Sequence, residues 1–233
     1  MTTTLRLISS MATRALLADL REAWLVLRPD IALDIESVGG VDAARRVQAG
    51  EPFDVVVLAA NVIDQLTHAG HVVPGSRADL VRSGVYVAVQ AGAPHPDIGS
   101  EEAVRQAVLA APSISYSTGP SGVYLVKLFE RWGIAEQIKP RTVQAPTGVP
   151  VGSLVARGEV ALGFQQLSEL IHLKGVDVVG PLPPELQLIT TFSAGLSVTS
   201  TQPEAVRALL AFLMSPAAEA AKRANGMEPG VSP

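Results

Sequence analysis

The sequence predicts an α/β fold in which helices cover mostly parallel sheets. Apolar runs typical of strands alternate with amphipathic helical stretches along nearly all of the 233 residues. Several runs, such as Val55–Leu58, are continuously apolar, as expected for strands buried on both faces of a parallel sheet. Parallel neighbours need long crossover connections, and the helical stretches between the runs can supply them.

The first part of the chain begins with an apolar strand that runs into two serines and a helical pattern. Glycine, proline and polar clusters then separate each run from the next. The predicted strands up to the middle of the chain are Leu5–Ile8, Ile31–Ile35, Val55–Leu58, Val85–Gln90 and Ser113–Tyr116. The predicted helices between them are Met11–Leu27, Val41–Ala49, Val62–Ala69, Glu101–Ala110 and Pro120–Trp132.

The second part of the chain continues the alternation with shorter elements. Its predicted strands are Arg141–Val143, Ala161–Phe164, Val176–Val179 and the long run Leu186–Thr199. Its predicted helices are Val149–Ala156, Gln166–Leu173 and Pro203–Ala224. We expect the last helix to be interrupted near Pro216, because proline lacks the N–H that a helix interior needs.

Two predicted strands connect two lobes. Val85–Gln90 lies between loops rich in proline and glycine, and Leu186–Thr199 is too long and too rich in β-formers for an ordinary crossover. The simplest arrangement is a discontinuous first lobe, residues 1–82 plus 195–233, with a second lobe, residues 83–194, inserted into it.

Composition excludes several classes of function. Hydrophobic residues make up 48% of the chain, but no apolar run reaches the roughly 18–20 residues of a membrane helix, so no membrane insertion is expected. The net charge of −4 and the lack of a basic stripe argue against nucleic acid as a partner. The chain has no cysteine, and its four histidines are scattered. We therefore expect no thiol chemistry, no metal site and no cofactor.

The start of the sequence suggests a cytoplasmic protein. Met1–Thr4 leads directly into a strand, without the basic and apolar segments of a secretory signal. If the chain lacks its native leader, the expected compartment is instead the periplasm. Only in that case is an ABC permease an expected partner.

Ser9 and Ser10 mark the first candidate ligand site. They follow a strand and precede a helix, where unpaired N–H groups and the helix dipole favour an anion. The alternative is that one hydroxyl simply caps the helix. Gly39 and Gly40 follow the second strand and allow close approach of backbone to a ligand. A tight turn would be sufficient to explain them, but they lie at the carboxyl end of a strand, where ligands bind in folds of this class.

A second candidate site follows the strand that ends near Tyr116. Thr118 and Ser121 surround a proline at the start of a helix, so hydroxyls and bare N–H groups again combine. An ordinary helix start remains an equal alternative. Gln165 and Gln166 follow a buried strand, and their amides are suited to a carboxylate or carbonyl. For the nearby Glu169, a solvated helix start is the favoured interpretation.

The chain resembles the type II periplasmic binding proteins, in the branch of the molybdate-binding proteins. The resemblance covers nearly the whole length and rests on four stretches: Ile8–Met11, Val47–Val56, Gly119–Tyr124 and Ala156–Gly163. It implies two lobes, each a mostly parallel sheet flanked by helices, two hinge strands, and a small anion held in the inter-lobe cleft by serines and helix N-termini.

The match to the molybdate site itself is incomplete. The loop Val38–Val41 has no serine where those proteins use a second hydroxyl. Pro150 falls where they use a backbone N–H, and Gln166 where they use a tyrosine. We therefore carry over the fold and the cleft, and expect a small carboxylate or another oxyanion rather than molybdate.

Three functions compete at this point. The first is a binding protein for a small organic carboxylate or oxyanion. The second is a cytosolic enzyme, an isomerase, lyase or hydrolase, acting on a small carboxylate in the same cleft. Tyr116, Glu169 or a histidine would then move a proton, but the sequence assigns no catalytic residue. The third is an effector-sensing module similar to those of LysR-type regulators, which ranks last because the chain has no DNA-binding segment.

Overall fold

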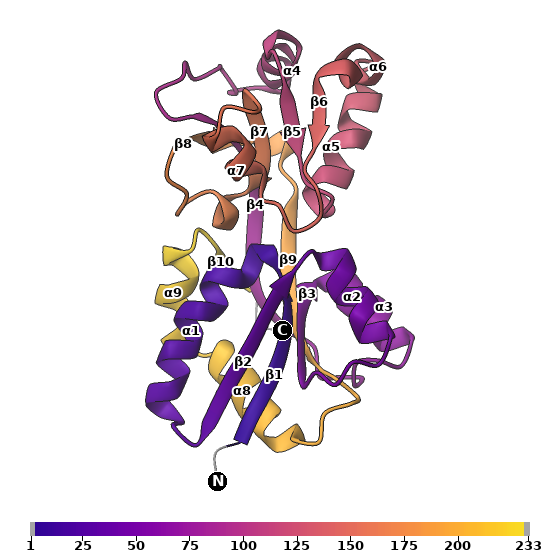
Figure 1. The fold of residues 1–233 in the computed structure, drawn as a ribbon, viewed down its shortest axis with the longest axis vertical. Coiled ribbons are helices and arrows are strands. Elements are labelled where there is room, and N and C mark those ends of the chain that lie inside the picture. The colour runs from indigo at the N-terminus through magenta and orange to yellow at the C-terminus, as the bar shows by residue number, and fades with distance from the viewer. Residues whose placement is uncertain (1–2, 231–233) are drawn as a thin grey trace. The chain divides into compact units, whose positions relative to one another are not determined.

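The chain divides into two compact units. A computed structural model describes residues 3–230, and contacts within it separate unit 1, Met1–Ser83 with Thr191–Pro233, from unit 2, Gly84–Thr190. Met1 and Thr2, on which the localisation prediction partly depends, lie outside the described residues. Figure 1 shows the elements of each unit.

Unit 1 contains a parallel three-stranded sheet in the order β2 (Ile31–Val38), β1 (Thr3–Ser10) and β3 (Val55–Ala59). The strand β9 (Ile189–Leu196) adds to β3 in the antiparallel direction. The short β10 (Glu228–Pro229) pairs with the first part of β4 (Ala78–Gln90). Helices α1 (Arg14–Leu27) and α8 (Pro203–Leu213) pack with one side of the sheet, and α2 (Gly40–Gln48) and α3 (Ala60–His68) with the other.

Alternation along β1 explains why both faces of this sheet are covered. Successive side chains of a strand point to opposite faces. Leu5 and Leu7 are buried in the cluster that includes α1 and α8, whereas Ile8 is buried in the cluster of α2 and α3. Trp24 on α1 fixes that helix to the sheet, because its indole N–H donates to the carbonyl of Ile31 at 3.1 Å.

Unit 2 contains a mixed sheet in the order β8 (Val176–Pro181), β4, β7 (Leu162–Gln166), β5 (Ile114–Tyr116) and β6 (Thr142–Gln144). The last three strands are parallel to one another, and β4 is antiparallel to both of its neighbours in this unit. Its helices are α4 (Glu101–Ala110), α5 (Pro120–Arg131), α6 (Ala135–Ile138) and α7 (Val151–Ala156). The short α9 (Glu219–Ala224) belongs to unit 1.

Two strands carry the chain from one unit to the other. In β4, Ala78–Ser83 belongs to unit 1 and the remainder to unit 2. In β9, the chain returns to unit 1 at Thr191. On the unit 2 side, the amide of Gln187 accepts from the backbone N–H of Val85 at 2.7 Å and donates to its carbonyl at 3.1 Å.

The α/β fold class predicted from the sequence is confirmed, and the differences are local. β4 begins at Ala78 rather than Val85, and the predicted strand Leu186–Thr199 is confined to β9 after a turn at Pro184–Leu186. The predicted helix Gln166–Leu173 is wrong. β7 extends to Gln166, and only a single 3-10 turn, Leu167–Glu169, follows it. Both glutamine side chains are buried and hydrogen-bonded, so the strand continues through them.

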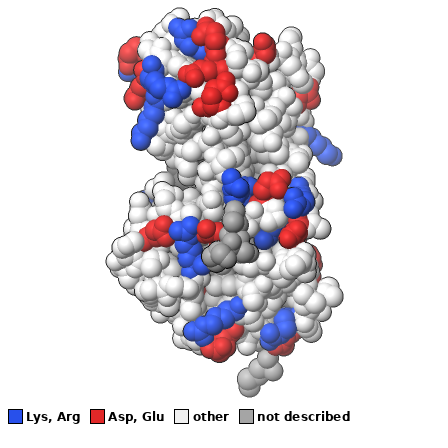
Figure 2. Space-filling view, turned by 180° about the vertical axis from the view of Figure 1, so that it is seen from behind, with Lys and Arg blue, Asp and Glu red and all other residues white. Residues whose placement is uncertain are grey.

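The surface charges form pairs of opposite sign. On the face in Figure 2, patches of Lys and Arg lie beside patches of Asp and Glu. Arg77, for example, contacts the carboxylates of both Asp64 and Asp79, at 2.8 and 2.7 Å. Among residues 3–230, no helix is long and apolar enough to cross a membrane.

Candidate functional site

Three parallel strands of unit 1 end at the same edge, and a helical segment begins directly after each. β1 ends at Ser10, β2 at Val38 and β3 at Ala59. None of the three helical segments that follow has a side-chain hydrogen bond at its N-cap. The first N–H groups of α2 and α3 are therefore not capped by a side chain, and the positive ends of two helix dipoles lie at this edge.

Ser9 and Ser37 bring two hydroxyls together at this edge. They are direct partners in the parallel register of β1 and β2, and their Oγ atoms are 2.7 Å apart. Ser9 is fully buried, whereas Ser37 is partly exposed. Either hydroxyl can be the donor, and the Oγ of Ser9 also lies 3.4 Å from the carbonyl oxygen of Ser10. When Ser9 donates to Ser37, the proton of Ser37 is free for a ligand.

Ser10 has a buried hydroxyl that lacks a partner among the described residues. The residue is 8% exposed, and its Oγ makes no hydrogen bond. It lies close to the start of α2, since a Cβ placed on Gly40 would be 3.9 Å from the Cβ of Ser10. Buried hydroxyls are nearly always paired, so this one is an available donor beside an uncapped helix start. We call Ser9, Ser10 and Ser37, with Gly39 and Gly40, the serine cluster.

A second set of hydroxyls surrounds the start of α5 in unit 2. The Oγ of Ser117 accepts from the N–H of Gly119 at 3.2 Å and lies 3.4 Å from the Oγ of Ser121, which is buried. Gly119 is the N-cap and provides no side chain, so the first N–H groups of α5 lack a side-chain cap. The side chain of Thr118 is partly buried and makes no hydrogen bond with another described residue.

Gly122 explains the tight turn before α5. A Cβ at this position would lie 1.7 Å from the carbonyl oxygen of Ser117, a separation that no side chain can occupy. Tyr116, at the end of β5, is partly buried against Phe129, with ring centroids 6.2 Å apart. Burial raises the pKa of its phenol, so the group stays protonated and is a hydrogen-bond donor at neutral pH.

A third group links β7 to α7. The Oε1 of Gln165 accepts from the N–H of Gly152 at 2.9 Å, and its Nε2 donates to the carboxylate of Glu169 at 2.7 Å. Burial raises the pKa of Glu169 to about 7, although the hydrogen bond from Gln165 acts in the opposite direction. Glu169 is therefore not the solvated residue favoured from the sequence. We call Gln165, Glu169 and Gly152 the glutamate cluster.

The sequence places Gln166 beside Gln165, but the structure gives it a different partner. Its Nε2 donates to the hydroxyl of Thr190 at 3.1 Å, and its side chain is buried. Because adjacent residues of a strand point to opposite faces of the sheet, the side chains of the two glutamines lie in different surroundings. The chain therefore brings together Ser9, Ser10, Gly39 and Gly40 in unit 1, and Ser121 with the neighbourhood of Tyr116 and Thr118 in unit 2.

A family model described as bacterial extracellular solute-binding protein matches residues 5–228. The chain belongs to this family. Among proteins of known sequence, it is 40% identical over 233 residues to an aconitate isomerase from a Pseudomonas species, with 97% of this chain and 88% of that protein covered.

Solved structures of other solute-binding proteins share the fold. The periplasmic molybdate-binding protein of Azotobacter vinelandii superposes with a TM-score of 0.80 at 20% identity, covering 98% of this chain and 99% of that one. The sulfate-binding protein SubI of Mycobacterium tuberculosis H37Rv gives 0.78 at 18% identity, covering 97% and 87%. These likenesses show a two-lobed periplasmic binding protein fold.

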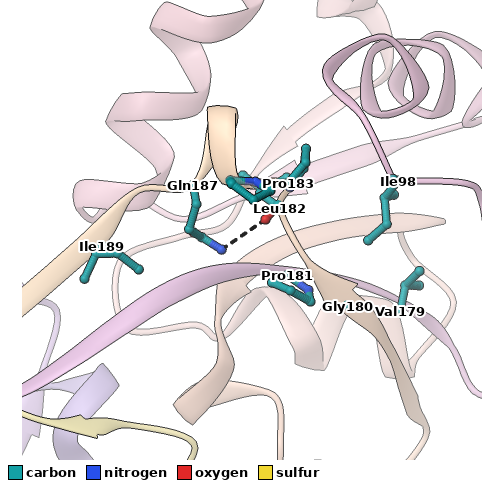
Figure 3. A pocket seen from close by; sticks show the side chains of 10 residues that line it. Ile98, Val179, Gly180, Pro181, Leu182, Pro183, Gln187 and Ile189 are labelled. Atoms are coloured by element: carbon teal, nitrogen blue, oxygen red, sulfur yellow. Dashed lines mark hydrogen bonds between the residues drawn. The ribbon is translucent and has the colours of Figure 1, made fainter.

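An open cavity in unit 2 of this solute-binding protein is unsuited to an anion. It has a volume of about 740 Å³ and is lined mainly by apolar groups of Ile98, Val179, Leu182, Ile189 and the prolines between them. Its one polar side chain, Gln187, is directed to backbone groups, including the carbonyl of Leu182 in Figure 3. The polar clusters are thus the better candidates for the ligand.

Two residues of the candidate site were not singled out from the sequence. Ser37 lies one residue before the loop Val38–Val41, and its importance follows only from the β1–β2 register that places it opposite Ser9. Ser117 replaces Thr118 as the hydroxyl bonded within the α5 turn. No group of three or more His, Asp or Glu side chains within residues 3–230 is arranged to hold a metal ion.

Proposed function

We propose that this solute-binding protein binds a small organic polycarboxylate. The observation that carries the proposal is the serine cluster, in which the unpartnered buried hydroxyl of Ser10 lies beside the uncapped start of α2. Helix N-termini and hydroxyl donors stabilise carboxylate charge without a metal.

A polycarboxylate fits this chain better than a tetrahedral oxyanion. Pro150 is the N-cap of α7 and has no N–H to donate, and the amide of Gln166 already donates a hydrogen bond to the hydroxyl of Thr190. Arg14, the first residue of α1, makes no ion pair with any described residue and remains exposed. A guanidinium so close in sequence to Ser10 suits a second carboxylate of the same ligand. The relative that is 40% identical is named for aconitate, a tricarboxylate.

The binding proposal is tested by thermal shift with a panel of anions. The panel contains cis- and trans-aconitate, citrate, propane-1,2,3-tricarboxylate, molybdate, tungstate and sulfate. A ligand at one hundred times its Kd stabilises the folded state by about 2.7 kcal/mol, which is readily measured. We expect stabilisation by at least one tricarboxylate, and weaker stabilisation in Ser10→Ala. Thr4→Ala, an exposed position on the same strand, is the control. Strong stabilisation by molybdate alone would contradict the proposal.

A second candidate function is isomerisation of such a ligand. The specific support is the name of the 40% identical relative, aconitate isomerase, together with a carboxyl group of unusual pKa at Glu169. The experiment incubates the protein with pure cis- or trans-aconitate and follows the vinyl proton signals by NMR. Interconversion faster than in buffer supports the enzyme, and unchanged isomers together with thermal stabilisation support binding alone.

A further inference from the structure

We propose that Glu169 is the group that moves the proton when this protein isomerises an unsaturated polycarboxylate. The inference rests on the second candidate function above and assigns a residue and a step to it. Its basis is the glutamate cluster, in which one carboxylate oxygen of Glu169 is fixed by Gln165 and no ion pair with a described residue holds the group.

The cluster fixes the position of the carboxylate. Gln165 is 1% exposed, and the N–H of Gly152 holds its amide oxygen, so the amide nitrogen is directed to Glu169. Gly152 is closely packed, because an added Cβ would lie 2.5 Å from a methyl group of Leu173 and 2.9 Å from one of Leu170, and these side chains would have to shift. The second carboxylate oxygen of Glu169 has no hydrogen-bond partner among the described residues. That oxygen is available for proton transfer.

The charge around Glu169 favours a group that both takes and returns a proton. The segments β7 and α7, between which the cluster lies, contain no charged side chain. The nearest charged residues after α7, Arg157 and Glu159, are exposed and pair with each other. Of the titratable side chains that follow Glu169 in the chain, His172 has interactions of its own and Lys174 is exposed. A carboxyl group with a pKa near 7 is populated in both forms at neutral pH, which suits general acid–base catalysis.

For aconitate as substrate, one carboxyl group that both takes and returns a proton is sufficient to move the double bond. Aconitate is a propene bearing three carboxylates, with a CH₂ beside the double bond and beside a carboxylate. Glu169 removes one proton from this CH₂, and the electron pair moves into the neighbouring double bond and its carboxylate. The protonated Glu169 then returns a proton to the former alkene carbon.

This reaction step needs no other reactant. One C–H bond breaks, another forms, and the double bond moves by one position, without oxidation or loss of atoms. Because the carbon skeleton is symmetric about its central carbon, the product is again aconitate. Its double bond has been formed anew and can take either geometry, so a proton shift accounts for cis–trans interconversion.

The experiment compares wild type, Glu169→Gln and the control Glu136→Gln in D₂O. Glu136 is an exposed glutamate of the same unit that forms an ion pair with Lys139. NMR follows interconversion of cis- and trans-aconitate and deuterium incorporation at the CH₂, and thermal shift measures binding. We expect Glu169→Gln to lower kcat by roughly 10²- to 10⁴-fold with KM and binding little changed, and the control to match wild type.

Each outcome separates this inference from the binding proposal. If kcat of Glu169→Gln stays within tenfold of wild type, Glu169 does not move the proton. If wild type is stabilised by aconitate but catalyses neither interconversion nor exchange, the inference fails while polycarboxylate binding stands. Glu169→Asp provides a second variant should the glutamine variant not fold. Aspartate keeps an ionisable carboxyl group on a side chain that is one methylene shorter. We expect its kcat to lie between the wild-type value and the background rate. A kcat equal to that of wild type would contradict the proposal that the carboxylate must be held at a fixed position.

Discussion

Ser9 and Ser37 lie opposite each other in the parallel register of β1 and β2, and their hydroxyl oxygens are 2.7 Å apart. The two residues are far apart in the chain, and only strand pairing brings them together. The next residue of β1, Ser10, has a buried hydroxyl without a partner among the described residues. The hydrogen bond between Ser9 and Ser37 joins the ends of the first and second strands.

Ser37→Ala tests this relationship. The substitution leaves the buried hydroxyl of Ser9 without its side-chain partner and removes the more exposed donor. We expect the free energy of unfolding to fall by about 1–2 kcal/mol and polycarboxylate affinity to fall by roughly tenfold. Urea unfolding and isothermal titration calorimetry measure the two effects. Unchanged affinity, with Thr4→Ala as control, would remove Ser37 from the site.

Glu169→Gln should change stability in a pH-dependent manner. The pKa of Glu169 is about 7 in the fold, against an ordinary value of 4.5. Between these values the folded protein keeps a proton that the unfolded chain has released, so this group lowers the wild-type free energy of unfolding as pH rises. Glutamine removes that dependence. Relative to wild type, we expect the free energy of unfolding of the variant to be little changed at pH 4.5 and higher by up to about 3 kcal/mol at pH 8.

The measurement for Glu169→Gln is urea unfolding of variant and wild type at pH 4.5, 6 and 8. Glu136→Gln, at a well-exposed position, should show no such trend. An equal stability difference at all three pH values would mean that the carboxyl group of Glu169 titrates normally.

Gly122→Ala should disrupt the turn before α5. The added methyl group would meet the carbonyl oxygen of Ser117, so either the turn or the helix start must shift. We expect a loss of more than about 2 kcal/mol of stability. Gly133→Ala is a useful control, since that glycine has a φ of +68° but nothing within 4 Å of an added Cβ. The control should lose only about 1 kcal/mol, from backbone strain alone. Equal losses in chemical unfolding would show that the clash is relieved.

Lys222→Met should stabilise unit 1. Lys222 on α9 is only 2% exposed, and desolvation lowers the pKa of its amine. Methionine keeps most of the apolar stem and removes a buried charge. We expect a gain of about 1 kcal/mol at pH 7 in chemical unfolding. Lys139→Met, at an exposed position, should change stability by less than about 0.5 kcal/mol. Destabilisation specific to Lys222→Met would indicate that the amine has a favourable partner in the folded protein.

The sequence predicted the α/β class and most helices because apolar periodicity reports burial directly. It failed where tertiary hydrogen bonds decide the local structure. Gln165 and Gln166 have polar side chains at the end of an apolar run, and nothing local shows that Gly152 and Thr190 hold them in a strand. The serines of the first strand stood out as candidates because they precede a helix. Ser37 did not stand out, since only the register of β1 and β2 places it opposite Ser9. The raised pKa of Glu169 could not be predicted either, because it results from burial, which the spacing of residues in the sequence does not show.

The order of the two units along the chain has a consequence for biosynthesis. The part of β9 from Thr191 onward, α8, α9 and β10 are translated last in unit 1, and every residue of unit 2 precedes them. On the ribosome, unit 2 can complete its sheet while β3 still waits for its antiparallel neighbour β9. A nascent chain halted near Thr190 would therefore present a finished second unit and an unfinished first one, whose apolar strand edge is exposed to chaperones.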